Sequence, residues 1–214
     1  MTATINASTS SGIVQTADTS GELALQSNGT TKLTVSSTGV AITGATLNGA
    51  SITSFGGGVI TSGTAQASTS GTSIDFTGIP SWVKRVTVMF NGVSTSGTSQ
   101  MQVQIGAGSV TTSGYLSVGG DFVISGGVGG TTSTTGFVTG DNVSNAVRHG
   151  HMVITSFGSN IWVSSHTIGS TTSNYVALGG GSIALSGTLD RVRITTVNGT
   201  DTFDAGSINI LFEG

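Results

Sequence analysis

Apolar and polar residues alternate with a period of two over much of this chain, which is the spacing of a strand with one buried face. The clearest stretch follows Pro80, the only proline, and sets Val86, Val88 and Phe90 against Arg85, Thr87 and Met89. Similar spacing predicts strands at Trp82–Phe90, Gln100–Ala107, His149–Ser156, Asn160–His166, Leu189–Val197 and Ser207–Phe212. No long stripe has the period of a helix, and Gly, Ser, Thr and Val are poor helix formers. The sequence therefore predicts an all-β protein.

These short strands, separated by Gly-rich turns, continue over residues 73–214. Such a run is typical of a β-sandwich, here with a jelly-roll-like arrangement, and we call this part the head. Residues 58–72 are rich in Gly, Ser and Thr and are interpreted as a linker. Residues 1–20 are small and polar, and are either an attachment arm or a frayed terminus.

Asn198-Gly199 is the clearest turn signal in the head. A two-residue hairpin at this point would place Ile194 opposite Phe203. Both apolar residues would then lie on one face, so the hydrophobic pattern agrees with the register. The sequence predicts that the strands on either side of this turn pair with each other.

A different pattern covers residues 21–57, where apolar residues occur singly or in short pairs between Gly, Asn, Ser and Thr. A two-residue hairpin at Asn28-Gly29 would set Leu25 opposite Lys32. It would then put Leu23 and Leu25 on the opposite face from Leu33 and Val35. A three-residue loop, or the winding together of several chains, would restore one common face.

So few apolar side chains do not offset the backbone entropy lost when the whole of residues 21–57 becomes ordered. Several identical chains wound together would enclose those side chains and pair the strand edges. We therefore predict a trimeric β stem, with a disordered linker as the alternative. Its expected core residues are Leu23, Leu25, Leu33, Val35, Val40, Ile42, Leu47 and Ile52.

Composition narrows the classes of function. Charged residues make up 7% of the chain, against about 25% in ordinary soluble domains. With a net charge of −3 and no basic patch, nucleic acid is not expected as a partner. No apolar span is long enough to cross a membrane, and the start has no pattern of a secretory signal. With no cysteine, no disulfide framework or thiolate metal site is available.

Candidate chemistry is sparse. His149 and His151 lie two residues apart on a predicted strand and so share a face, a spacing that metals can use. Only one other histidine, His166, exists, so an exposed pair is favoured over a metal site. Asp121 or Asp141 would contribute to such a ligand set, and a metal on a three-fold axis, held by one histidine from each chain, also stays open. No serine lies in the context of a catalytic nucleophile, and we expect neither catalysis nor a cofactor.

Aromatic residues are the remaining candidates for a binding surface. Trp82 and Trp162 lie inside predicted strands and are expected in the core or between subunits. Tyr115 and Tyr175 lie next to Ser/Thr/Gly loops and are the expected surface-binding residues. The run Gly126–Gly130 lacks the lysine of a phosphate loop and is interpreted as a surface loop.

Three stretches resemble proteins of tailed bacteriophages. The block TSIDFTGIPSWVKRVTVMFNGVSTSGTS (72–99) resembles a module of tail-fibre-like and other virion surface proteins, and LDRVRITTVNGTDTFDAGSINILFE (189–213) resembles the end of that module. The stretch GELALQSNGTTKLTVSSTGVAITG (21–44) is similar to the intertwined shafts that precede such heads.

This resemblance implies a homotrimer on a virus particle, attached to capsid or tail proteins through its N-terminus. Assembly in the bacterial cytoplasm would suit a chain without cysteine or a signal. The chain is shorter than long tail fibres, which favours a capsid decoration or a small accessory fibre that aids host adhesion. The alternative is a receptor-binding fibre tip that recognises a glycan of the host surface.

Overall fold

The computed structural model describes residues 23–36, 39–42, 45–47, 50–52, 60–140, 143–144 and 146–214. Within these residues the chain forms strands and no helix, which confirms the all-β class. No described helix therefore offers a membrane span. The chain divides into two compact units, Met1–Gly57 and Gly58–Gly214. We describe each unit by itself.

The first unit contains a three-stranded antiparallel sheet in the order β1-β2-β3 and a separate hairpin of β4 and β5. The bounds are β1 (Leu23–Ser27), β2 (Thr30–Ser36), β3 (Gly39–Ile42), β4 (Ala45–Leu47) and β5 (Ala50–Ile52). Asn28 and Gly29 form the turn between β1 and β2, with φ of 52° and 71°. Positive φ at both positions is what a two-residue hairpin needs, and Asn-Gly supplies it at little steric cost.

A β-bulge resolves the conflict of faces that the sequence raises for this hairpin. Ser27 pairs with Thr30 and Gln26 with Thr31, but the register then shifts and Leu25 pairs with Leu33. Lys32 is the extra residue on β2. Because one residue is skipped, every apolar position beyond it changes face. Neither a longer loop nor a second chain is needed to put the apolar positions of β1 and β2 on one side.

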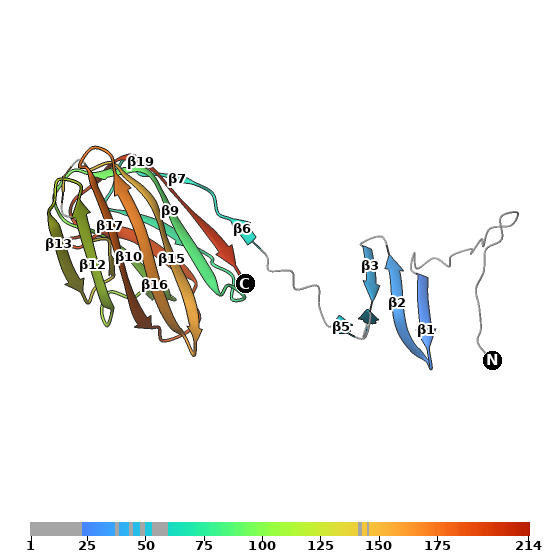
Figure 1. Cartoon of the computed structure of the whole chain (residues 1–214). Helices are drawn as coiled ribbons and strands as arrows, with labels where there is room; N and C mark the ends of the chain where they lie inside the picture. The colour runs from blue at the N-terminus through green and yellow to red at the C-terminus, as the bar shows by residue number, and fades with distance from the viewer. Residues whose placement is uncertain are drawn as a thin grey trace, which may run out of the picture. The chain divides into compact units, whose positions relative to one another are not determined.

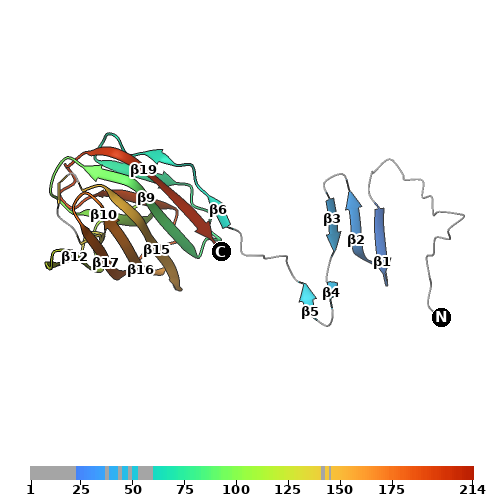
Figure 2. The same cartoon turned by 45° about the horizontal axis from the view of Figure 1, so that its top comes forward.

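The second unit contains two antiparallel sheets, which we call the large and the small sheet. The large sheet has the order β13-β12-β17-β16-β15-β9-β19-β6, with β7 also paired to β19. The small sheet has the order β11-β10-β18-β8, with β14 paired to β10. In Figure 1, β12, β17, β16 and β15 run side by side in one layer, with β10 in the layer behind. Figure 2 shows β19 beside β9 at the other part of the large sheet.

The strands of this unit extend or trim the predicted ones by several residues at their ends. Their bounds are β6 (Ile60–Ser62), β7 (Gln66–Ala67), β8 (Ser73–Thr77), β9 (Arg85–Thr95), β10 (Met101–Ala107), β11 (Ser109–Val110), β12 (Leu116–Val123), β13 (Val128–Ser133), β14 (Phe137–Val138), β15 (Arg148–Gly158), β16 (Ile161–Ser170), β17 (Tyr175–Ala184), β18 (Arg191–Thr196) and β19 (Phe203–Glu213).

One hydrophobic cluster joins the two sheets. On β9 of the large sheet, Val86, Val88 and Phe90 are buried as the alternation predicts. On the small sheet, Val103 of β10 and Ile194 of β18 are directly paired and belong to the same cluster. The inward residues of both sheets therefore form a shared core, the arrangement of a sandwich.

The described part of the predicted linker, residues 60–72, contains two strands of the head. Ile60 pairs with Glu213 and Leu211 with Ser62, so β6 extends the large sheet beyond the last strand. A few residues later β7 pairs with the same strand through Gln66. Short, polar edge strands are common at sheet margins, and they have the same composition as connectors. The head therefore includes residues that the sequence assigned to the linker.

The predicted hairpin at Asn198-Gly199 is wrong. β18 pairs with β10 and β8 in the small sheet, while β19 pairs with β9 in the large sheet. The Asn198 side-chain oxygen accepts the backbone N–H of Thr200 at 3.0 Å and of Asp201 at 3.2 Å. This Asx-type turn carries the chain from one sheet to the other. Ile194 and Phe203 both lie in the core, but they pair with other strands and not with each other.

Candidate functional sites

The eight predicted stem residues fall into two groups. In the three-stranded sheet, Leu23 pairs with Val35 and Val35 with Val40, while Leu25 pairs with Leu33 and Leu33 with Ile42. Residues paired across strands, and residues two apart along a strand, share a face. The six positions therefore form two apolar rows on one face, which we call the stem face.

The other two stem residues lie in the separate hairpin. Leu47 pairs with Ala50 and Ile52 with Ala45, so these four positions also share one face. In the single chain, Leu23, Leu25 and Val35 of the stem face are 42%, 41% and 38% exposed. Each of the two sheets thus gathers its apolar positions on one of its own faces, and Leu23, Leu25 and Val35 are only partly covered.

Tyr115 is not a surface residue, contrary to the sequence prediction. It is 0% exposed. Its hydroxyl accepts the backbone N–H of Ile105 at 2.7 Å and donates to the carbonyl of Ile105 at 3.2 Å. Its ring packs edge-to-face on Phe137, with centroids 5.0 Å apart. Burial raises the pKa of Tyr115 to about 12, although the backbone hydrogen bond with Ile105 opposes the rise.

Tyr175 is also buried, at 2% exposed, beside Ala146 and Ala177 in a small second cluster. Both tyrosines were expected at the surface because Ser, Thr and Gly loops adjoin them. The burial of Tyr175 follows from its position in the strand: it is the first residue of β17 and faces inward, as Ala177 two residues later does. Neither tyrosine can contact a ligand at the surface of the described head.

The histidines do not converge. His149 and His151 lie exposed on β15, as expected for a pair on one face of a strand. The Nδ1 of His149 accepts the backbone N–H of Gly92 at 3.3 Å. His166 is buried, with its Nε2 3.0 Å from the carbonyl of Thr139. Among the described residues, no three His, Asp or Glu side chains form a group able to hold a metal. Asp141 lies outside the described residues.

Three further expectations have mixed outcomes. Trp162 is buried in the core, as expected. Trp82 precedes β9 instead of lying in it, and is 40% exposed. In the run Gly126–Gly130, Val128 and the residues after it belong to β13, so only the first part is a turn.

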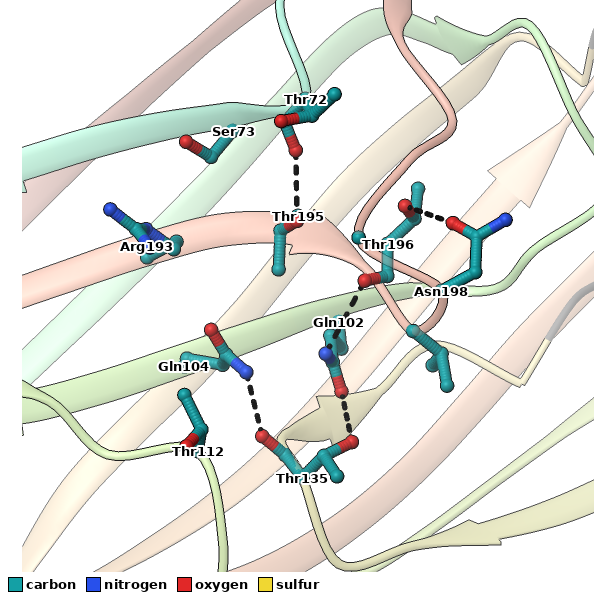
Figure 3. Close-up of a pocket in the computed structure, with 12 residues that line it drawn as sticks. Thr72, Ser73, Gln102, Gln104, Thr112, Thr135, Arg193, Thr195, Thr196 and Asn198 are labelled. Atoms are coloured by element: carbon teal, nitrogen blue, oxygen red, sulfur yellow. Dashed lines mark hydrogen bonds between the residues drawn. The ribbon is translucent and has the colours of Figure 1, made fainter.

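The sequence did not single out a polar groove on the small sheet. Two polar rows cross its strands: Ser73 pairs with Thr195 and Thr195 with Gln102, and Asp75 pairs with Arg193 and Arg193 with Gln104. Together with the Asn198 turn, Thr112 and Thr135, parts of these rows line a groove of about 310 Å³. Figure 3 shows these side chains gathered from β10, β18 and the adjoining loops.

Hydrogen bonds already connect much of this groove. Gln104 Nε2 donates to the carbonyl of Thr135 at 2.8 Å, and the Thr135 hydroxyl donates to Gln102 Oε1 at 2.9 Å. The Thr196 hydroxyl donates to Asn198 Oδ1 at 2.9 Å (Figure 3). Amides held in this way are fixed in direction, and they suit a neutral polar ligand better than they suit proton transfer.

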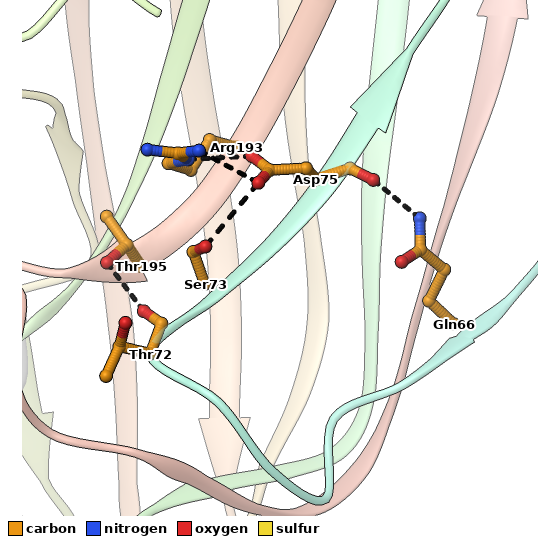
Figure 4. Close-up of polar contacts among 6 residues, drawn as sticks. All are labelled: Gln66, Thr72, Ser73, Asp75, Arg193 and Thr195. Carbon is orange, nitrogen blue, oxygen red and sulfur yellow. Dashed lines mark hydrogen bonds and ion pairs between the residues drawn. The ribbon is translucent and has the colours of Figure 1, made fainter.

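An ion pair borders the groove. Arg193 donates from Nε and Nη2 to the two carboxylate oxygens of Asp75, at 2.7 and 2.9 Å. Figure 4 shows the two side chains facing each other from neighbouring strands, with Gln66 donating to the backbone carbonyl of Asp75 at 2.7 Å. The bidentate bond to Asp75 holds the pKa of Arg193 above its usual range. Its guanidinium is thus a fixed charge, already paired.

The signal for this groove was present as the alternation of Gln102 and Gln104 with Met101, Val103 and Ile105. The sequence alone did not show which strands lie beside β10 in the sheet. Asp75, Arg193 and Gln104 are far apart in the chain, and only the sheet order brings them into one row.

Comparison with protein-family models, with curated proteins and with solved structures finds no match to this chain.

Proposed function

We propose that this protein is a non-enzymatic structural component of a tailed-bacteriophage particle, a homotrimeric knob or short fibre that decorates the capsid or serves as an accessory fibre. The observation that carries the proposal is the stem face. Six apolar positions lie in register on one side of a three-stranded sheet, and Leu23, Leu25 and Val35 among them are about two-fifths exposed. In one chain these side chains leave apolar area in water, and burial of that area would stabilise the sheet by roughly 25 cal/mol per Å².

Three copies would cover the stem face mutually, because identical faces on a three-fold axis enclose a common core. The phage setting is supported by the resemblance of residues 21–44, 72–99 and 189–213 to virion surface proteins. Within it, the first twenty residues attach the trimer to capsid or tail proteins and the heads point outward. The head would assist adhesion, with its affinity raised by the presence of three tethered copies.

Molar mass measured by light scattering tests the trimer. The full chain is expected at three times its 21.1 kDa. The variant Leu25→Asp places a charge in the stem face and is expected to yield the monomer, since an unpaired charge is costly to bury. Gln26→Asp is the matched control, because Gln26 is the next residue on β1 and points to the other side. A monomeric wild-type chain would sink the proposal.

The phage setting needs its own test. Antibody labelling of intact particles, viewed by electron microscopy, is expected to mark the capsid or the tail. The same images distinguish a decoration from a fibre. If particles from a host that expresses the chain carry no label, the virion location is wrong, while the proposed trimer is unaffected.

A second candidate, recognition of a host-surface glycan, is favoured by the polar groove of the small sheet. Its hydroxyl and amide groups match the hydrogen-bonding capacity of sugars, although no tyrosine or tryptophan lines it. A glycan array with the full chain tests this. Thr112→Trp fills the groove from an exposed position and is expected to abolish any signal, while Ser113→Trp beside it is expected to leave the signal intact.

A further inference from the structure

The outer side of the large sheet carries an apolar surface that nothing in the described chain covers. Along β12, Leu116, Val118 and Phe122 point outward, while Ser117 and Gly119 between them are buried. We name as the apolar outer face the six residues Leu116, Val118, Phe122, Val128, Val176 and Leu178. Each of them is between 40% and 77% exposed. Isolated exposed apolar residues are ordinary, but a connected group of this size is not.

The sheet register shows that these residues are neighbours. Phe122 is paired on one side with Val128 of β13 and on the other with Val176 of β17. Val118 is paired with Gly180, two residues from Leu178 on the same side of β17. Cross-strand partners and diagonal neighbours lie within reach of such side chains. The six residues therefore form one continuous surface.

A depression borders this surface at Leu116 and Val118, and Gly180 is one of its lining residues. Gly120 and Gly180 occupy outward positions between the apolar residues and place no side chain there. Leu116, Val118, Thr132 and Gly180 help to line a mainly apolar depression of about 440 Å³. A protruding apolar side chain fits such a depression, which favours docking by a shaped partner over simple contact with solvent.

The surface carries no charge. The other outward positions on β12, β13, β17 and β16 include Thr132, Ser165, Thr167, Gly180 and Ser182, none of which is ionisable. Asp121, the one acidic residue on β12, lies on the inward side of the sheet, where it is paired with the buried Ala177. Two copies of this surface can therefore meet without repulsion between like charges and without stranding an ion.

We infer that the apolar outer face is where the heads of this protein contact one another, so that its occupant is a second copy of the chain. An uncharged apolar face that spans the three neighbouring strands β13, β12 and β17 can be covered by the same face of a second copy without burying a charge. The inference rests on the proposed trimer, because heads joined to one stem are held at effective concentrations of about millimolar. At that concentration even a weak apolar contact is populated.

The absence of cysteine provides a clean test on the full chain. Leu178→Cys places a single thiol on the apolar outer face, and Ser109→Cys places one on β11 of the small sheet as a matched control. With a short bis-maleimide, Leu178→Cys is expected to form chain-to-chain products in about tenfold greater yield, as tethered contact predicts. Unchanged circular dichroism and thermal midpoints verify that both variants fold.

The outcomes separate this inference from the proposed trimer. A trimeric mass with equal yields from the two cysteines overturns the head contact and leaves the stem trimer standing. Preferential crosslinks of Leu178→Cys that persist when Leu25→Asp breaks the stem support the head contact, even if the stem fails. Crosslinks on particles to a different virion protein, without any between copies, overturn the inference.

Discussion

The two outer surfaces of the head differ sharply although both are built from alternating strands. On the small sheet the outward rows are Ser73, Thr195 and Gln102, and Asp75, Arg193 and Gln104. These groups bond to one another and to the adjoining loops, as Arg193 does to Asp75 and Gln104 to the carbonyl of Thr135. On the large sheet the outward residues of β12 are apolar or glycine, and so are those of β17 except Ser182. Alternation alone thus predicts which positions face outward. Whether the outward side chains are polar or apolar then indicates whether that surface can stay open to solvent or is suited to a contact with another chain.

The largest expected effect comes from placing a charge on the apolar outer face. In Val118→Asp, association between heads is expected to weaken by several kcal/mol, because like charges would face each other in the contact. Thr112→Asp on the small-sheet side is the control and is expected to change little. Sedimentation equilibrium at protein concentrations up to about millimolar, in the Leu25→Asp background that is monomeric in dilute solution, measures the difference. Equal association constants would show that the two surfaces are equivalent.

Tyr115 directly precedes β12 of the large sheet and bonds to Ile105 of β10 in the small sheet. A change at Tyr115 is therefore expected to lower the stability of the whole head. Tyr115→Phe keeps the ring but leaves the backbone N–H of Ile105 without its 2.7 Å acceptor. The expected loss is about 1–3 kcal/mol of unfolding free energy, the cost of a buried group left unpaired. Urea unfolding at neutral pH measures it, and a loss near zero would mean that water replaces the hydroxyl.

The same residue predicts loss of stability at alkaline pH. The pKa of Tyr115 rises from 10.0 to about 12 on folding because the buried hydroxyl resists ionisation. Its contribution is complete below pH 10 and is lost as pH rises from about 10 through about 12, amounting to roughly 2–3 kcal/mol. Tyr115→Phe should flatten this part of the stability curve. An equally steep loss in that variant would assign the effect to other groups.

The ion pair of the small-sheet surface is expected to matter less. Arg193 and Asp75 are both more than a third exposed, so solvent and salt screen their attraction. Arg193→Gln is expected to cost about 0.2–1 kcal/mol, with the difference from wild type shrinking in high salt. Unfolding at low and high ionic strength measures it. A cost that does not depend on salt would point to lost packing instead of lost charge.

The smallest expected effect lies on the acid side. Hydrogen bonds from the Arg191 side chain lower the pKa of Asp190, and those from the Asn198 side chain lower the pKa of Asp201. The folded chain then binds fewer protons than the unfolded chain near pH 4. Stability from these groups is therefore complete above the unfolded pKa of about 4 and is lost as pH falls below it. Asn198→Ala should reduce the slope, as measured by thermal unfolding between pH 5 and pH 2.

The Asn28-Gly29 hairpin was predictable in part from local sequence. The turn and the pairing of Ser27 with Thr30 follow from two residues, but the skipped Lys32 does not. A bulge is selected because it moves the leucines of β1 and β2 to a common face, which is a property of the assembled sheet.

The sequence by itself determined the all-β class, the position of most strands, the inward residues of β9 and the partition after Gly57 into a stem and the rest. These depend on period, turn residues and composition, all of which are local. Only the tertiary structure decided that β18 and β19 belong to different sheets, that Tyr115 and Tyr175 are buried, and that Asp75, Arg193 and Gln104 share one row. Those outcomes depend on which strands become neighbours, and pairing between distant segments is set by the packing of the whole core, which no short window of the chain contains.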